Sequence, residues 1–249
     1  ADSWKDGDTM GQGLRWAHAG AVARTTGKVF FTLDGTDYVC SGTAISSASE
    51  DVVLTAAHCA GNATGKWASN WIFVPGYRDG KQPYGAFTAR TFYVSRQWSG
   101  DAQSASAERY DIAFVTVNPS NGRRLGQAVG GQPAAFGDAA TGLADKPGAG
   151  TYVFGYPSEP PFSGEYTDYC AGAARQTSAD IAIDAVGLDC GMTAGDSGGP
   201  WLAGFSPRTG TGTVVAVTTY KFSNDRGELY GTVLDANARE LYDEANAGS

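Results

Sequence analysis

Turn-forming residues interrupt this chain so often that long helices are excluded from most of it. Glycine occurs 35 times and proline 10 times among the 249 residues, and both residue types tend to end regular elements because of their backbone conformations. The short runs between them are rich in valine, isoleucine, phenylalanine, tyrosine and threonine, which are enriched in β-strands. The pattern therefore predicts an all-β protein built from many short antiparallel strands.

The strand-like runs form two series on either side of a polar, glycine-rich stretch at 118–133, which we interpret as a linker. We therefore expect an N-terminal domain over residues 1–122 and a C-terminal domain over residues 123–249. The runs themselves are 28–33, 38–45, 52–56, 71–74, 86–94 and 112–117 in the first series, and 151–155, 181–183, 200–203, 213–220 and 229–234 in the second.

The last element of the chain differs from the rest. Residues 235–246 contain no glycine or proline, and Asp235 is suited to cap the first turn of a helix. Ala238, Leu241, Tyr242 and Ala245 recur at helical spacing. We expect a C-terminal amphipathic helix that packs on the β-structure.

Charge and composition exclude several classes of partner. Lys+Arg number 18 against 26 Asp+Glu, a net charge of −8, and Arg123-Arg124 is the one adjacent basic pair in the sequence. Nucleic-acid binding depends on clustered basic residues, so it is not expected. Apolar runs such as 112–115 are far shorter than the ~20 residues of a membrane helix, so no membrane association is expected.

The cysteines and histidines bear on compartment and on metals. The four cysteines, at 40, 59, 170 and 190, form no Cys-x-x-Cys clip, and His18 and His58 are the two imidazoles. A zinc site is therefore poorly supplied, and we expect neither a metal nor a cofactor. Two disulfides indicate an extracellular, secreted protein whose signal and any pro-segment have already been removed.

Gly195-Asp-Ser-Gly-Gly-Pro200 carries the first candidate for chemistry. A serine hydroxyl is a weak nucleophile that needs a base in contact and a fixed pose. Glycines on both sides allow a sharp turn and a close approach by a substrate carbonyl. The N–H groups of Gly195 and Ser197 can then point into one small space and act as an oxyanion hole.

A base and an orienting carboxylate complete such a site. His58 follows an apolar strand and precedes Cys59, so a disulfide there would immobilise the backbone beside the base, whereas His18 is interpreted as a surface or packing histidine. Asp111 stands at the head of a buried strand, where a carboxylate is costly unless it has a partner. A structural histidine remains the alternative for His58.

Three motifs in this order, Thr55-Ala-Ala-His-Cys59, Asp111-Ile-Ala and Gly195-Asp-Ser-Gly-Gly-Pro200, together resemble the trypsin/chymotrypsin family of serine peptidases. Tyr38-Val-Cys-Ser-Gly-Thr43 extends the resemblance, which covers the chain from residue 28 to its end and is stronger to secreted bacterial members than to animal ones. It implies two six-stranded antiparallel β-barrels with the active site between them, followed by the C-terminal helix.

The resemblance also implies roles. His58 would be the general base and then the acid, Asp111 would orient it, and Ser197 would attack the peptide carbonyl. Gly195 and Ser197 would supply the oxyanion N–H groups. The family pairing joins Cys40 to Cys59, which leaves Cys170 to pair with Cys190. Protein or peptide substrates and protein inhibitors of proteases would be the partners of a monomeric enzyme.

Substrate preference is also expected by resemblance. The residue before the scissile bond (P1) would enter a pocket without the acidic residue of trypsin-like members, because Gly191 occupies that position. We therefore expect an apolar P1 residue, while Asp189 and Lys221 leave basic and acidic P1 residues open. The pocket would be walled by Gly191, Met192, Thr193, Ala194, Thr219, Tyr220 and Lys221, with Gly231 opposite.

A function from another class is a catalytically inactive, protease-like binding protein. Such proteins usually lack at least one of the three catalytic residues. Here His58, Asp111 and Ser197 fill all three positions, which favours the enzyme.

Overall fold

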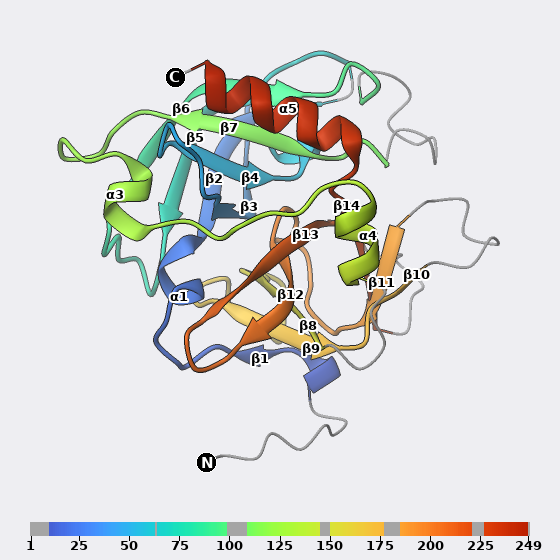
Figure 1. The fold of residues 1–249 in the computed structure, drawn as a ribbon. Helices are drawn as coiled ribbons and strands as arrows, with labels where there is room; N and C mark the ends of the chain where they lie inside the picture. Colours follow the sequence, from blue (N-terminus) through green and yellow to red (C-terminus); the bar gives the residue numbers. More distant parts are fainter. Residues whose placement is uncertain are drawn as a thin grey trace.

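The structure is a computed structural model that describes residues 10–62, 64–98, 109–144, 150–176, 185–220 and 227–248. It consists mainly of β-strands in two sheets. Short helices lie in the connections between strands, and one longer helix lies at the C-terminal end (Figure 1). Within these ranges, no helix has the length and apolar character needed to cross a bilayer. The expected strand at 181–183 lies outside the described residues.

The first sheet is a closed barrel in the order β2-β3-β4-β7-β6-β5. The hairpin between β2 and β3 turns at Asp34 and Gly35, which have φ values of 51° and 79°, as a two-residue hairpin turn requires. Val29, Phe73 and Val115 are fully buried inside the barrel. Its strands are β2 Thr26–Leu33, β3 Thr36–Ala44, β4 Val52–Thr55, β5 Ser69–Pro75, β6 Phe87–Val94 and β7 Ala113–Val117.

The second sheet has eight strands in the order β1-β9-β8-β12-β13-β14-β11-β10. Its six central strands form an open half-barrel that corresponds to the second barrel of a chymotrypsin-like fold, so the expected all-β, two-barrel fold class is confirmed. The strands are β1 Leu14–Arg15, β8 Thr151–Gly155, β9 Asp168–Gly172, β10 Arg175–Gln176, β11 Ala185–Asp189, β12 Pro200–Ser206, β13 Thr211–Tyr220 and β14 Glu228–Val233.

The second sheet differs from the expected closed barrel in one respect, because its ends do not pair with each other. Strand β1 pairs with β9 and strand β10 pairs with β11, so both edges that would close the barrel already have partners. The disulfide Cys170–Cys190 instead connects β9 to the residue that follows β11. A covalent bond, and not strand pairing, therefore connects β9 to the end of β11.

The C-terminal helix α5 (Ala236–Ala247) is confirmed close to its predicted bounds. The Asp235 side chain accepts a hydrogen bond of 2.8 Å from the Ala238 N–H, as a capping residue should. Ala238, Leu241 and Ala245 are buried. The helix lies along β6 and β7 of the first barrel (Figure 1), although the chain reaches it from the second sheet.

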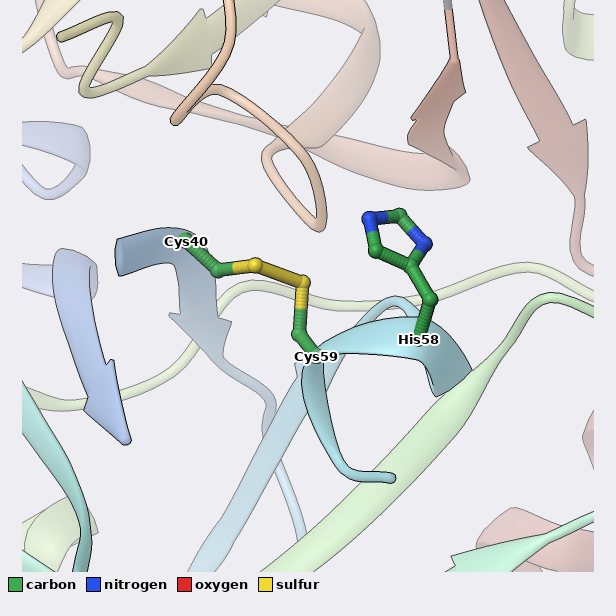
Figure 2. A group of neighbouring side chains, drawn as sticks. All are labelled: Cys40, His58 and Cys59. Atoms are coloured by element: carbon green, nitrogen blue, oxygen red, sulfur yellow. A yellow bond between two sulfur atoms is a disulfide. The ribbon is translucent and has the colours of Figure 1, made fainter. Parts of the chain in front are cut away.

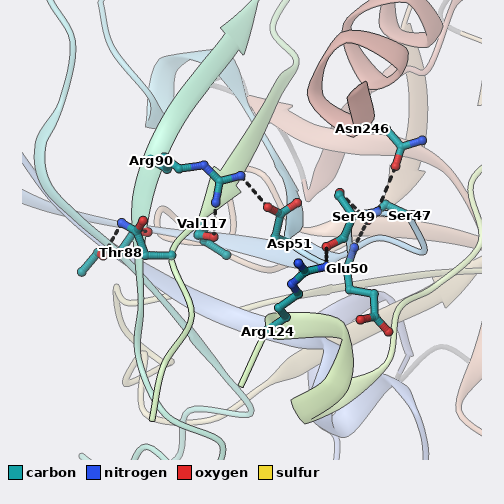
Figure 3. A network of polar contacts seen from close by, with 10 residues as sticks. Ser47, Ser49, Glu50, Asp51, Thr88, Arg90, Val117, Arg124 and Asn246 are labelled. Atoms are coloured by element: carbon teal, nitrogen blue, oxygen red, sulfur yellow. Dashed lines mark hydrogen bonds and ion pairs between the residues drawn. The ribbon is translucent and has the colours of Figure 1, made fainter. Parts of the chain in front are cut away.

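Polar contacts tie this helix to the turn between β3 and β4 (Figure 3). The Asn246 side-chain oxygen accepts hydrogen bonds from the N–H groups of Ala48 and Ser49, at 2.9 and 3.3 Å. Arg90 pairs with the nearby Asp51 carboxylate on the barrel. The C-terminal helix α5 thus packs on the first barrel, whereas the N-terminal strand β1 pairs with β9 in the second sheet. The domain boundary at residues 122 and 123 stays a prediction.

The remaining helices are short. They are η1 Met10–Gln12, α1 Val22–Thr25, η2 Ala57–Cys59, α3 Leu125–Val129 and α4 Asp138–Ala144. The most important for the site is η2, because it follows β4 directly and places His58 at the end of the first barrel.

Candidate active site

His58 and Asp111 are in direct contact. The Nδ1 atom of His58 lies 2.7 Å from Oδ2 of Asp111, and the backbone N–H of His58 donates to Oδ1 at 2.9 Å. The Asp111 side chain is 4% exposed and that of His58 is 36% exposed. One edge of the imidazole is thus held by a buried carboxylate while the ring keeps access to solvent.

The electrostatics of the pair favour a charged carboxylate. Burial raises the pKa of Asp111, but the charge of His58 and the hydrogen bonds from His58 and Thr219 outweigh it and hold the pKa below its ordinary value of 3.8. Burial lowers the pKa of His58, but attraction to Asp111 and the hydrogen bond with it, aided by Asp196, raise the pKa above 6.5. Each group therefore stabilises the charged form of the other.

A third donor reaches the same carboxylate from the other sheet. The hydroxyl of Thr219, near the end of β13, donates a hydrogen bond to Oδ2 of Asp111. Thr219 is 4% exposed. Its hydroxyl therefore serves the carboxylate, a role that differs from the substrate-pocket wall expected from the sequence.

A disulfide fixes the backbone beside the histidine. Cys40 on β3 is bonded to Cys59 on η2, next to His58 (Figure 2). The pairings Cys40–Cys59 and Cys170–Cys190 are thus both confirmed. The sulfur atoms of Cys40 and Cys59 and a ring nitrogen of His58 lie within 4.8 Å of one another. Because the two sulfurs are bonded together, they are not thiolates and do not form a metal-binding set.

Ser197 lies against this same segment. Its carbonyl oxygen is 3.8 Å from Sγ of Cys59 and accepts a hydrogen bond of 2.7 Å from the N–H of Ser41. The next residue, Gly198, leaves no room for a side chain, since a Cβ there would lie 2.2 Å from Oγ1 of Thr55. The structure therefore brings the serine turn, the histidine segment and Asp111 into one region between the two sheets.

The backbone before Ser197 is oriented in a way that suits an oxyanion hole. The carbonyl oxygen of Ala194 accepts hydrogen bonds from the N–H and the hydroxyl of Ser158, at 2.7 and 3.0 Å. In a trans peptide the N–H points opposite to the C=O, so the N–H of Gly195 points away from Ser158. In the described part of the chain, no backbone carbonyl accepts from the N–H of Gly195 or of Ser197.

Three residues of the expected substrate pocket lie against other parts of the protein. Gly191 is covered by the N-terminal segment, because a Cβ there would lie 2.6 Å from the carbonyl oxygen of Gln12. Met192 is fully buried, so its side chain does not face an open pocket as expected. Gly231 also differs from the expectation. Because side chains alternate along β14, a Cβ at Gly231 would point into the core and lie 2.7 Å from Cε2 of Trp201.

The other expected pocket residues divide between loop and strand. The hydroxyl of Thr193 bonds to the backbone of Glu159, at 3.0 and 3.2 Å, while Ala194 is exposed. Strand β13 ends at Tyr220, and Lys221 lies outside the described residues.

Asp189 is engaged elsewhere. Its carboxylate pairs with Arg175 at 2.7 Å, and the same guanidinium group contacts Glu228 at 3.0 Å. The Asp189 side chain is 76% exposed.

Sequence reasoning missed three contributors to the site. These are Ser41, Ser158 and the Asp111-binding hydroxyl of Thr219. Ser41 lies inside the motif 38–43, but nothing in the local sequence signals its partner, because Gly195 is 154 residues away along the chain. The same holds for Thr219, which is 108 residues from Asp111.

Comparison with known proteins gives a consistent result. The model of a family described as "Trypsin-like peptidase domain" matches residues 40–225. Protease Anisep from Arthrobacter nicotinovorans is 36% identical, with 90% of this chain and 96% of that chain covered and a TM-score of 0.79. The thermostable serine protease AL20 from an extremophilic microorganism is 28% identical, with 92% and 100% covered and a TM-score of 0.79.

More distant likenesses add less. A Glu endopeptidase shares the fold at 20% identity, with 95% of this chain and 97% of that chain covered and a TM-score of 0.70. A protein of Bacillus subtilis (strain 168) named "Extracellular metalloprotease" is 25% identical over 131 residues, which is 53% of this chain. The matched region spans 37% of that protein's length.

Proposed function

The chain belongs to the trypsin-like peptidase family, and on this basis we propose that it is a secreted serine endopeptidase with Ser197 as nucleophile. The observation that carries the proposal is the 2.7 Å contact between His58 and Asp111 beside the turn that bears Ser197. The substrates would be proteins or peptides, the enzyme would act as a monomer, and protein inhibitors would bind the same site.

The proposed reaction begins with proton transfer. The free ring nitrogen of His58, Nε2, accepts the hydroxyl proton of Ser197 as Oγ attacks the carbonyl carbon of the scissile peptide bond. The carbonyl oxygen becomes an oxyanion and receives hydrogen bonds from the N–H groups of Gly195 and Ser197. His58 then gives its proton to the leaving amine, and an acyl-enzyme ester remains on Ser197.

The second half of the reaction repeats these steps with water. His58 takes a proton from water, the resulting hydroxide attacks the ester carbonyl, and the proton returns to Oγ of Ser197 as the acid product leaves. Asp111 keeps the Nδ1–H tautomer in place, which leaves Nε2 free as the base. It also stabilises the imidazolium that forms in each half.

Extracellular location is part of the proposal. Two disulfides are present, and such bonds persist in oxidising compartments. The name of the Bacillus subtilis relative also contains the word extracellular. We assign His58 and Asp111 to an N-terminal domain over residues 1–122, and Ser197 to a C-terminal domain over residues 123–249.

For the substrate pocket we propose a wall formed by Gly191, Thr193, Ala194, Tyr220 and Lys221, with preference for an apolar P1 residue. Gly191 brings no charge to this pocket. Asp189 is already paired with Arg175 at 2.7 Å, which reduces its attraction for a basic P1 side chain. Discrimination among apolar side chains should be graded, because one methylene changes binding by only ~1–3 kcal/mol.

The proposal is tested by measuring peptide hydrolysis by the variant Ser197→Ala and by the wild type. We expect loss of nearly all peptide hydrolysis while the protein still folds, because the change removes one oxygen atom from a side chain that is only half-buried. Ser206→Ala, on β12, is the matched control and should keep full activity. Equal turnover by Ser197→Ala and the wild type would refute Ser197 as nucleophile. An inactive wild type would instead favour a protease-like binding protein.

A further inference from the structure

The hydroxyl of Ser41 connects the two sheets at the turn before Ser197. Ser41 lies on β3 of the first barrel and is fully buried. Its Oγ donates a hydrogen bond of 2.8 Å to the carbonyl oxygen of Gly195 and accepts one of 2.8 Å from the N–H of Tyr156. A single hydroxyl thus satisfies a buried acceptor and a buried donor from the second half of the chain.

The backbone of Ser41 contacts the same turn. Its N–H donates to the carbonyl oxygen of Ser197 at 2.7 Å. Its carbonyl oxygen accepts a hydrogen bond of 2.8 Å from Thr55, which lies three residues before His58. One residue of the first barrel therefore holds the segment between Gly195 and Ser197 at two points and also contacts the segment that leads to the base.

Gly195 needs such external restraint. Its φ of +104° lies in a region that only glycine adopts readily, and glycine has no side chain to limit rotation about φ and ψ. Ser158 holds the peptide group on the N-terminal side of Gly195 through the carbonyl of Ala194. The bond from Ser41 holds the peptide group on its C-terminal side. Both torsions of Gly195 are therefore set by hydrogen bonds from outside the turn.

We propose that Ser41 is a positioning residue for the oxyanion hole, acting through its hydroxyl on Gly195 and through its N–H on Ser197. It touches no reacting atom. Through the two carbonyls it restrains ψ of Gly195 and ψ of Ser197, the torsions adjoining the residues that bear the two N–H groups. Loss of its hydroxyl leaves the carbonyl of Gly195 and the N–H of Tyr156 buried without this partner. This inference rests on the proposed function.

The test is Ser41→Ala, assayed with a peptide substrate and with a peptide aldehyde as inhibitor. The aldehyde forms a hemiacetal with Ser197 whose oxygen occupies the oxyanion hole. A displacement of the N–H groups by a fraction of an ångström should lower kcat about tenfold to a hundredfold. KM should stay within about threefold, because ground-state binding does not use the hole. The inhibition constant of the aldehyde should rise by about the same factor as kcat falls.

Thr43→Val is the matched control. Thr43 lies two residues away on the same strand and is fully buried, and its hydroxyl has no hydrogen-bond partner among the described residues. This variant should keep kcat, KM and aldehyde inhibition. Rates are expressed per active site, counted with a fluorophosphonate, so that a loss of folded protein does not imitate a loss of kcat.

The outcomes separate the two proposals. Wild-type kcat and aldehyde inhibition in Ser41→Ala, with an active wild type, would overturn the role of Ser41 and leave the proposed function intact. An inactive wild type would overturn both. If Ser41→Ala does not fold, Ser41→Cys takes its place, because a thiol is a weaker donor of similar shape. It should show a smaller loss of the same kind, and unchanged kcat would again overturn the inference.

Discussion

Replacing Thr219 by valine removes one of the donors that hold Asp111 while keeping the shape of the side chain. The Asp111 carboxylate accepts the Thr219 hydroxyl and two groups of His58, its N–H and Nδ1. A hydrogen bond to a charged group contributes about 1.5–3 kcal/mol. Because Asp111 is buried and ionised, we expect Thr219→Val to lower the free energy of unfolding by about that amount.

Activity should fall as well. With the hydroxyl gone, only His58 donates to Asp111 among the contacts described, so the carboxylate holds the imidazole less firmly. A modest loss of alignment can lower kcat/KM by about tenfold or more. The assays are urea unfolding at pH 8, where Asp111 is ionised in both states, and kcat/KM on one peptide substrate.

Two control variants make the result specific. Thr219→Ser keeps the hydroxyl and should stay close to the wild type in both assays. Thr116→Val removes a buried hydroxyl of β7 that has no partner in the described residues, and it should cost little. If Thr219→Val matches the wild type in both assays, or if Thr219→Ser loses as much as Thr219→Val, the Thr219 hydroxyl does not hold Asp111 in the way described.

Three other outcomes follow from the structure. The pKa of His58 is raised above 6.5. Because only the neutral imidazole accepts a proton, kcat/KM should rise with pH and reach half its maximum above 6.5. A midpoint of the profile below about 6 would contradict this expectation. Burial, partly offset by Arg15, raises the pKa of Asp168 from 3.8 to about 6. Between these two pH values the folded protein therefore holds a proton on Asp168 that the unfolded chain releases, and the free energy of unfolding should fall as pH rises from 3.8 to about 6. Asp168→Asn should remove most of that fall in urea titrations, and an unchanged pH dependence in this variant would argue against the assignment. Gly198→Ala should fold poorly or lose most activity, because its φ is +80° and a Cβ would meet the Ser41 carbonyl at 2.4 Å; Gly204→Ala, at φ +59° with open space around it, is the control with similar backbone strain.

Local patterns predicted the elements whose residue types and spacing are distinctive. The run 235–246 showed a cap, a helical apolar face and no glycine, and it forms α5 with Asp235 as its capping residue. Strand runs such as 86–94, which forms β6 at Phe87–Val94, were found because β-branched and aromatic residues cluster between turns. The disulfide pairs came from resemblance, since spacing alone leaves the pairing of four cysteines open.

Long-range features were beyond such patterns. The pairing of β1 with β9 depends on two residues, Leu14 and Arg15, that show no strand signal by themselves. The resemblance places Gly231 at the pocket, but in the register of β14 a Cβ at this position would point toward Trp201. Which side a strand residue faces depends on a shift of one position, and a single sequence does not determine that shift.

Hydrogen bonds across the two sheets were equally hidden. The local sequence around Ser41 does not indicate that its hydroxyl binds Gly195, because the two residues come together only when the two sheets pack against each other. For this reason Asp111 and the Cys40–Cys59 bridge were predictable as partners of the His58 segment, whereas the contacts of Ser41 and Thr219 from one sheet to the other were not.

Fluorophosphonate labelling followed by peptide mass spectrometry shows whether His58 activates Ser197 for nucleophilic attack. Of the serines in the chain, only Ser197 should carry the phosphonyl group, and His58→Ala should slow its labelling by orders of magnitude while the protein stays folded. Labelling at another serine, no labelling of the folded wild type, or equal rates in wild type and His58→Ala would refute Ser197 as the nucleophile or His58 as its base.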